Sequence, residues 1–108
     1  MGLFSRKKQN TFQTAMLEKV HGRSIRYAAQ RVLDENGNPT EVILGKNGAI
    51  NTIENRIVLM CNGKEVFRCD AEGASISELM SLNGVVIEGV NAITGEKNTV
   101  VAYFTGYR

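Results

Sequence analysis

The sequence has few of the residues on which metal and redox sites depend. Of its 108 residues, one is histidine, two are cysteine, one is proline and none is tryptophan. A single histidine, His21, excludes a histidine-based metal cluster within one chain. Cys61 and Cys69 lack the C-x-x-C spacing of zinc ribbons and thioredoxin-like motifs. The low proline content and the lack of tryptophan also give no sign of a proline-rich linker or of an aromatic groove for polyproline.

Long apolar runs and phosphate-binding loops are missing as well. No stretch approaches the roughly 20 apolar residues that span a bilayer, and the basic residues 6–8 are followed by polar residues rather than by the apolar core of a secretory signal. Neither G-x-G-x-x-G nor the Walker A pattern occurs. No pair of acidic residues is placed in one cleft, as general acid–base catalysis requires. We therefore expect a cytoplasmic protein that is not an enzyme, does not span a membrane and holds no cofactor.

What the sequence does contain is turn signals. Asn and Gly both tolerate positive φ, so an Asn-Gly pair between apolar runs is a strong indication of a β-hairpin. Thr94–Gly95 provides a further turn. The four Asn-Gly pairs are Asn36–Gly37, Asn47–Gly48, Asn62–Gly63 and Asn83–Gly84.

These turns predict a mainly β fold, an antiparallel meander or partly open small barrel of about six or seven strands with one or two short helices. We expect residues 11–108 to form one domain and residues 1–10 to form a flexible basic arm. Apolar spacing predicts a helix over residues 11–21, with Gly22 as its left-handed stop. The S-x-x-E sequence of residues 75–78 has capping-box spacing and predicts a second helical turn that continues to Leu82.

Residues 24–34 fit two structures. As a helix they carry an apolar stripe, and the alternative fold is then α+β with an N-terminal helical pair. As a strand they form a hairpin with residues 41–44 across the turn at residues 34–39. We favour the strand because the turn residues are followed directly by the β-prone run Glu41 to Leu44.

The hairpin expected over residues 56–70 is apolar on both faces. Ile57, Leu59 and Cys61 with Val66 form one face, and Val58 and Met60 with Phe67 form the other. In a sheet with one face in water, apolar and polar residues should alternate along each strand. Because this hairpin is apolar on both faces, we expect it to be covered on both sides. Across Asn62–Gly63, Cys61 should face Lys64 and Cys69 should face Arg56, which leaves two buried free thiols, as suits a reducing compartment.

Two functions follow as expectations. The first is a non-catalytic interaction module that self-associates, or binds a protein partner, through an apolar β surface. Aromatic residues near the C-terminus strengthen this interpretation, because aromatics are enriched at interfaces. The candidate interface residues are Ile57, Leu59, Val66, Tyr103, Phe104 and Tyr107.

The alternative is a small β-barrel that binds RNA or DNA with its basic N-terminal third. Residues 1–33 hold seven basic groups and one acidic group, whereas residues 34–108 hold six basic and ten acidic groups. Such an asymmetry indicates an anionic partner for the basic segment. The candidate contacts are Arg6, Lys7, Lys8, Lys19, Arg23, Arg26 and Arg31.

Overall fold

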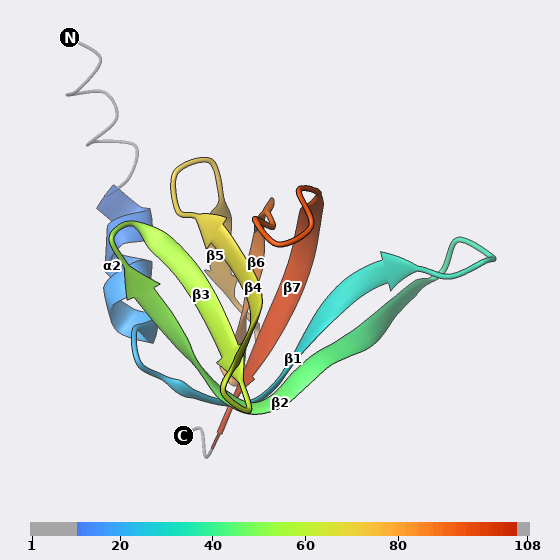
Figure 1. Ribbon diagram of the computed structural model, residues 1–108, viewed down its shortest axis with the longest axis horizontal. Coiled ribbons are helices and arrows are strands. Elements are labelled where there is room, and N and C mark those ends of the chain that lie inside the picture. The colour runs from blue at the N-terminus through green and yellow to red at the C-terminus, as the bar shows by residue number, and fades with distance from the viewer. Residues whose placement is uncertain (1–10, 106–108) are drawn as a thin grey trace, which may run out of the picture.

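A computed structural model describes residues 11–105 of the chain. Within this range one helix is followed by seven antiparallel strands that form a single sheet in the order β4-β3-β2-β1-β7-β6-β5 (Figure 1). The predicted mainly β fold is confirmed. The arm predicted over residues 1–10 lies outside the described residues. The elements are α2 Thr11–Val20, β1 Ser24–Leu33, β2 Pro39–Ile53, β3 Arg56–Cys61, β4 Lys64–Asp70, β5 Ser75–Glu78, β6 Gly84–Val90 and β7 Lys97–Phe104.

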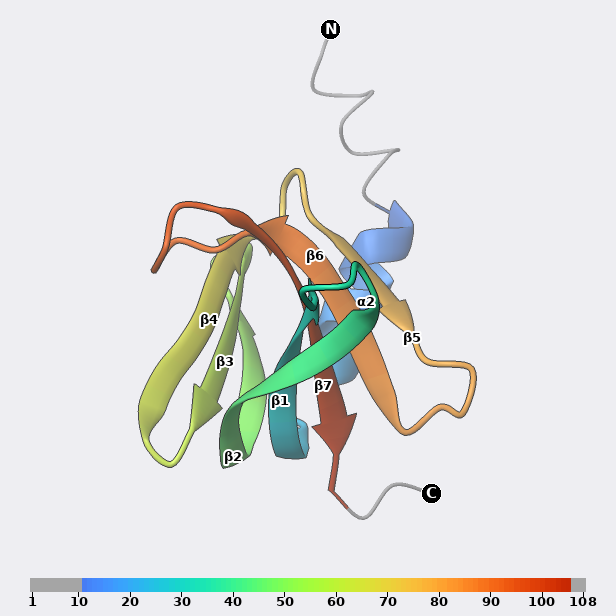
Figure 2. The ribbon, with the colours of Figure 1, turned by 90° about the vertical axis from the view of Figure 1, so that its right-hand side faces the viewer.

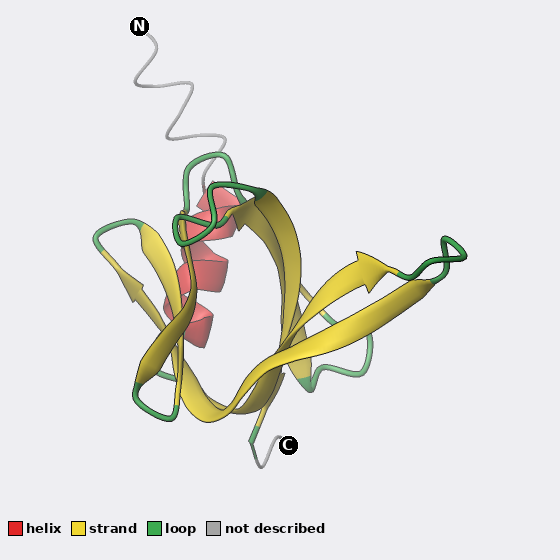
Figure 3. Cartoon of the chain, turned by 45° about the vertical axis from the view of Figure 1, so that its right-hand side comes forward, coloured by secondary structure: helices red, strands yellow, loops and turns green. Residues whose placement is uncertain are grey.

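The sheet curls around one hydrophobic core without closing, because its edge strands β4 and β5 do not pair with each other (Figure 3). Helix α2 lies against β2 and β5 and buries Met16 and Val20 in that core. These residues are four apart and therefore share one face of the helix. The helix ends as predicted, since Gly22 adopts a φ of 79°. An ion pair of 2.9 Å between Lys19 and Glu78 joins the helix to β5.

Residues 24–33 form a strand, so the helical alternative for this segment is wrong. β1 pairs with β2 on one side and with β7 on the other. The β1–β2 turn is stabilised by Asp34, whose carboxylate oxygen accepts hydrogen bonds of 2.9 Å from the backbone amides of Asn36 and Asn38. This side-chain turn explains why the chain reverses at Asn36–Gly37 as predicted.

The turn predicted at Asn47–Gly48 is wrong. β2 continues through it, pairing with β1 over residues 39–49 and with β3 over residues 48–53. Glycine is needed here for close approach, because a Cβ atom on Gly48 would overlap the backbone of Met60. The chain reverses at Glu54–Asn55, where the sequence also indicates a bend, and the φ angles of 54° and 64° suit a two-residue hairpin loop.

The helical turn predicted from the capping box at residues 75–78 is also wrong. These four residues form strand β5, which pairs with β6 from Ser75 opposite Glu88 to Glu78 opposite Val85. Ile76 is buried between exposed serines, which is the alternation of a strand. Tertiary pairing with β6 therefore outweighs the local capping signal. Asn83 ends the β5–β6 connection and Gly84 begins β6, where its carbonyl oxygen accepts a hydrogen bond of 2.9 Å from the Leu79 amide.

The β3–β4 hairpin turns at Asn62–Gly63 as predicted, with Cys61 opposite Lys64. An irregularity between Leu59 and Met60 then shifts the register, so Cys69 lies opposite Ile57 and not opposite the predicted Arg56. The same shift places Phe67 opposite Leu59, and both side chains are fully buried. The prediction of two buried free thiols is confirmed.

Candidate functional site

The distal part of the β1–β2 hairpin projects from the barrel (Figures 1 and 3), and Figure 2 views the same hairpin nearly end-on. From here on, the arm means residues 29–43 of this hairpin and not the N-terminal segment of residues 1–10. It begins after the register irregularity between Ala28 and Ala29. β7 pairs with β1 no further than Arg31, and β3 pairs with β2 only from Gly48 onward. Beyond Arg31 the arm is therefore a ribbon of two strands. An isolated two-stranded ribbon has marginal stability in water.

Both faces of the arm expose large apolar side chains. Leu33 is 70% exposed, Val42 is 52% exposed and Ile43 is 49% exposed. The pairing of Ala29 with Ile43 and of Leu33 with Pro39 places Leu33 and Ile43 on one face, with Val42 on the other. Three such residues on one narrow ribbon differ from apolar residues scattered singly over a surface, which are normal.

The face that carries Leu33 and Ile43 continues onto the barrel wall as an aromatic surface. Tyr27 of β1 lies opposite Tyr103 of β7, and their ring centroids are 4.7 Å apart. The Tyr103 hydroxyl donates to Glu41 at 3.1 Å, and Arg31 lies 3.8 Å from the same carboxylate oxygen. Burial, then the hydrogen bond with Glu41, raises the pKa of Tyr103. The hydroxyl is therefore a stable donor at neutral pH.

Three of the predicted anionic-partner contacts interact with other groups of the chain. Lys19 pairs with Glu78, Arg31 pairs with Glu41, and the Arg23 guanidinium lies 3.8 Å from the centroid of the Phe104 ring. Arg26 is exposed on β1. Arg6, Lys7 and Lys8 lie outside the described residues.

The predicted interface residues divide between core and surface. Ile57, Leu59 and Phe104 are in the hydrophobic core, so they are covered within the chain. Val66 is half-buried and packs against that core, and Tyr103 is half-buried on the aromatic surface described above. Tyr107 lies outside the described residues. Sequence reasoning missed Leu33, Val42 and Ile43, although their place in a hairpin beside a turn was visible.

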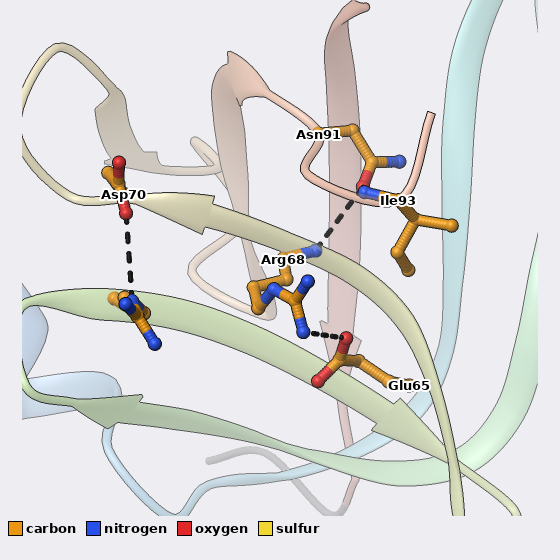
Figure 4. A network of polar contacts seen from close by, with 6 residues as sticks. Glu65, Arg68, Asp70, Asn91 and Ile93 are labelled. Atoms are coloured by element: carbon orange, nitrogen blue, oxygen red, sulfur yellow. Dashed lines mark hydrogen bonds and ion pairs between the residues drawn. The ribbon is translucent and has the colours of Figure 1, made fainter. Parts of the chain in front are cut away.

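A cavity of about 550 Å³ lies beside the edge of β4, lined by charged side chains and by Cys69. Figure 4 shows polar contacts of residues beside it. Arg68, which lines the cavity, pairs with Glu65 at 2.7 Å, and Asp70 pairs with Arg56 at 3.7 Å. Burial, and secondarily the charge of Asp70, raises the pKa of the Cys69 thiol to about 11. The thiol is therefore protonated at neutral pH and is a poor nucleophile.

Asn91 connects two of the segments that line this cavity, strand β4 and the β6–β7 connection. Its buried side-chain amide donates to Asn98 at 3.1 Å, and its side-chain oxygen accepts from the Ile93 amide at 3.0 Å and from the Arg68 amide at 3.5 Å. The Ala92 amide donates to the Arg68 carbonyl oxygen at 2.7 Å. These contacts join the β6–β7 connection to β4, so Asn91 has a structural role at the barrel opening.

Residues 11–105 include neither a cluster of metal ligands nor a membrane-spanning helix. That part of the chain contains no cluster of three or more His, Cys, Asp or Glu side chains that could hold a metal ion. Its helix is too short and too polar to cross a membrane. His21 is exposed and accepts a hydrogen bond of 2.9 Å from the Thr52 amide through Nδ1. This bond links the end of α2 to β2.

Comparison of the chain with known protein families, with curated proteins and with solved structures finds no match.

Proposed function

We propose that this protein is a non-catalytic interaction module that self-associates through an apolar β surface, and that this surface is on the arm. The observation that carries the proposal is the projecting two-stranded ribbon with Leu33, Val42 and Ile43 exposed. Covering these side chains removes apolar area from water, and each Å² that is buried stabilises the associated state by about 25 cal/mol. A second copy also stabilises a ribbon that is marginal alone.

Self-association is expected to use the faces of the arm rather than its edges. Along β2 the unpaired edge begins with Pro39 and includes the charged residues Glu41 and Lys46. Proline and charged side chains on an edge strand oppose the addition of a further strand. The exposed apolar groups, by contrast, project from the two faces.

A non-catalytic role agrees with the chemistry of the candidate groups. The Cys69 thiol is protonated at neutral pH, and His21 is engaged with the Thr52 amide. Two buried free thiols suit a reducing compartment, and this supports our proposal that the protein is cytoplasmic.

Sedimentation equilibrium tests the proposal. The wild-type protein is expected to associate with increasing concentration, and Leu33→Asp combined with Val42→Asp is expected to weaken association at least about tenfold, equivalent to about 1.4 kcal/mol. Ile53→Asp is the matched control, because Ile53 is 55% exposed at the far end of β2. Far-ultraviolet circular dichroism verifies that each variant folds. A wild-type protein that stays monomeric at all practical concentrations refutes the proposal.

Binding of RNA or DNA gains no specific support from the described residues, because Lys19, Arg23 and Arg31 make contacts within the chain. Filter binding at low salt checks this second function, since phosphate contacts give a steep salt dependence.

A further inference from the structure

We infer that two copies of this chain pair through their arms about a twofold axis, with the tip of each arm over the root of the other. The inference rests on the proposed function and specifies its geometry. It starts from the distribution of charge along the arm, which differs in sign between the two ends.

The tip of the arm, at the turn after Leu33, is acidic, and its root, the part of the hairpin that adjoins the arm at residues 26–28 and 44–46, is basic. Asp34 and Glu35 are exposed at the tip, whereas Arg26 and Lys46 are exposed at the root. Lys46 lies opposite Tyr27 in the β1–β2 ladder. From residue 27 to residue 34 the strand extends about 23 Å, at about 3.3 Å per residue. This distance is larger than the Debye length at physiological salt, about 8 Å, so the two ends act as separate charges.

The root charges lie on the same face as Leu33 and Ile43, whereas Val42 lies on the opposite face. Ile25 and Ala28 both point into the core, and the β1–β7 register is irregular between residues 25 and 27. Arg26 and Tyr27, which stand between the two core residues, are therefore both directed away from the core. Leu33 and Ile43 share this outward face, because Ala29 and Tyr27 alternate with the core residue Ala28.

A twofold axis that crosses the arms near residue 30 matches these features to themselves. Antiparallel stacking of the two outward faces lays β1 of one copy over β1 of the other, about 10 Å apart. Leu33 of one copy then lies over the Tyr27 ring of the second copy. Glu35 of one copy reaches Arg26 of the second, and each contact occurs twice because the interface is isologous. Parallel stacking would place Glu35 against Glu35 and Arg26 against Arg26.

Charge reversal tests the arrangement by sedimentation equilibrium on the full chain. Glu35→Arg is used at the tip, because Asp34 holds the turn, and Arg26→Glu is used at the root. Each single variant is expected to weaken the dimer about tenfold, since two attractive contacts become repulsive. The double variant is expected to return to within about threefold of the wild type, because both contacts are again attractive. Glu18→Arg, on the exposed side of α2, is the control for net charge.

The outcomes separate the two hypotheses. One outcome is a dimer that dissociates when Leu33→Asp and Val42→Asp are combined and yet keeps its affinity in both single charge-reversal variants. That result supports self-association and refutes the antiparallel arrangement. Single reversals that weaken the dimer without recovery in the double variant also refute it. A monomeric wild type refutes both the arrangement and the proposed function. Circular dichroism verifies the fold of every variant.

Discussion

The backbone amide of Ala92 donates a hydrogen bond to the carbonyl oxygen of Arg68 at 2.7 Å, which joins the β6–β7 connection to the edge of β4. The side chain of Asn91 completes this junction through the Arg68 amide (Figure 4). The barrel is therefore bridged at this point by a loop rather than by a strand pair.

Asn91→Ala is expected to lower the free energy of unfolding by about 2 kcal/mol, because the substitution leaves buried polar partners unsatisfied. Asn98 and the Ile93 amide each lose one hydrogen bond. Urea unfolding measures the change. Thr94→Ala in the same loop removes only an exposed hydrogen bond of 3.3 Å to the Glu96 amide and should cost less than about 0.5 kcal/mol. Equal costs for the two variants would contradict the role of Asn91.

Gly48→Ala is expected to destabilise the fold by about 3 kcal/mol or more, because the added methyl group overlaps the backbone of Met60 on the neighbouring strand. Gly63→Ala is the comparison. Gly63 has a φ of 78° with open space around it, so alanine there meets only backbone strain of about 1 kcal/mol. Chemical unfolding ranks the two variants. A larger loss at Gly63 would show that close strand approach at Gly48 is unimportant.

High pH is expected to destabilise the protein through Cys69. The pKa of this thiol is raised in the folded state from 9.0 to about 11, so the folded protein holds the proton more tightly than the unfolded chain does. The contribution of this thiol to the free energy of unfolding is fully present below about pH 9, and it is lost as the pH rises towards about 11. Urea unfolding at about pH 8 and about pH 10.5 should show a smaller loss in Cys69→Ala than in the wild type. An identical loss in both proteins would rule out this coupling.

His21→Ala is expected to loosen the contact between helix α2 and strand β2. The Thr52 amide donates to His21 Nδ1 at 2.9 Å, and that hydrogen bond is worth about 1 kcal/mol. Hydrogen exchange of the Thr52 amide should accelerate in the variant, and amides near the β3–β4 turn should keep their rates. Glu18→Ala, on the exposed side of the helix, is the control and should leave the Thr52 amide protected.

The sequence predicted the local reversals where the turn residues themselves supply the stabilisation. Asp34 accepts two backbone hydrogen bonds within its own turn, and Asn62–Gly63 forms a two-residue loop with positive φ at both positions. The strand predicted over residues 24–34, which the structure shows as Ser24–Leu33, was inferred from the same turn chemistry. These features depend on neighbours in sequence and are therefore visible without the fold.

The errors occurred where a distant strand decides the local structure. The S-x-x-E sequence at Ser75 can cap a helix, but pairing with β6 makes it a strand. Asn47–Gly48 can turn, but β3 crosses close to Gly48 and β2 continues. The candidate site was missed for the same reason. The apolar pattern of the arm resembles that of the buried hairpin at Ile57, and only the packing determines which of the two is covered.

By itself the sequence determined a β-rich chain with its thiols apart and its charge divided between the two ends, because composition and turn chemistry are local properties. The tertiary structure alone decided that Leu59 is covered within the chain while Leu33 faces water. The physical reason is that burial depends on how far each strand finds neighbours, and beyond Arg31 the hairpin has none among the described strands.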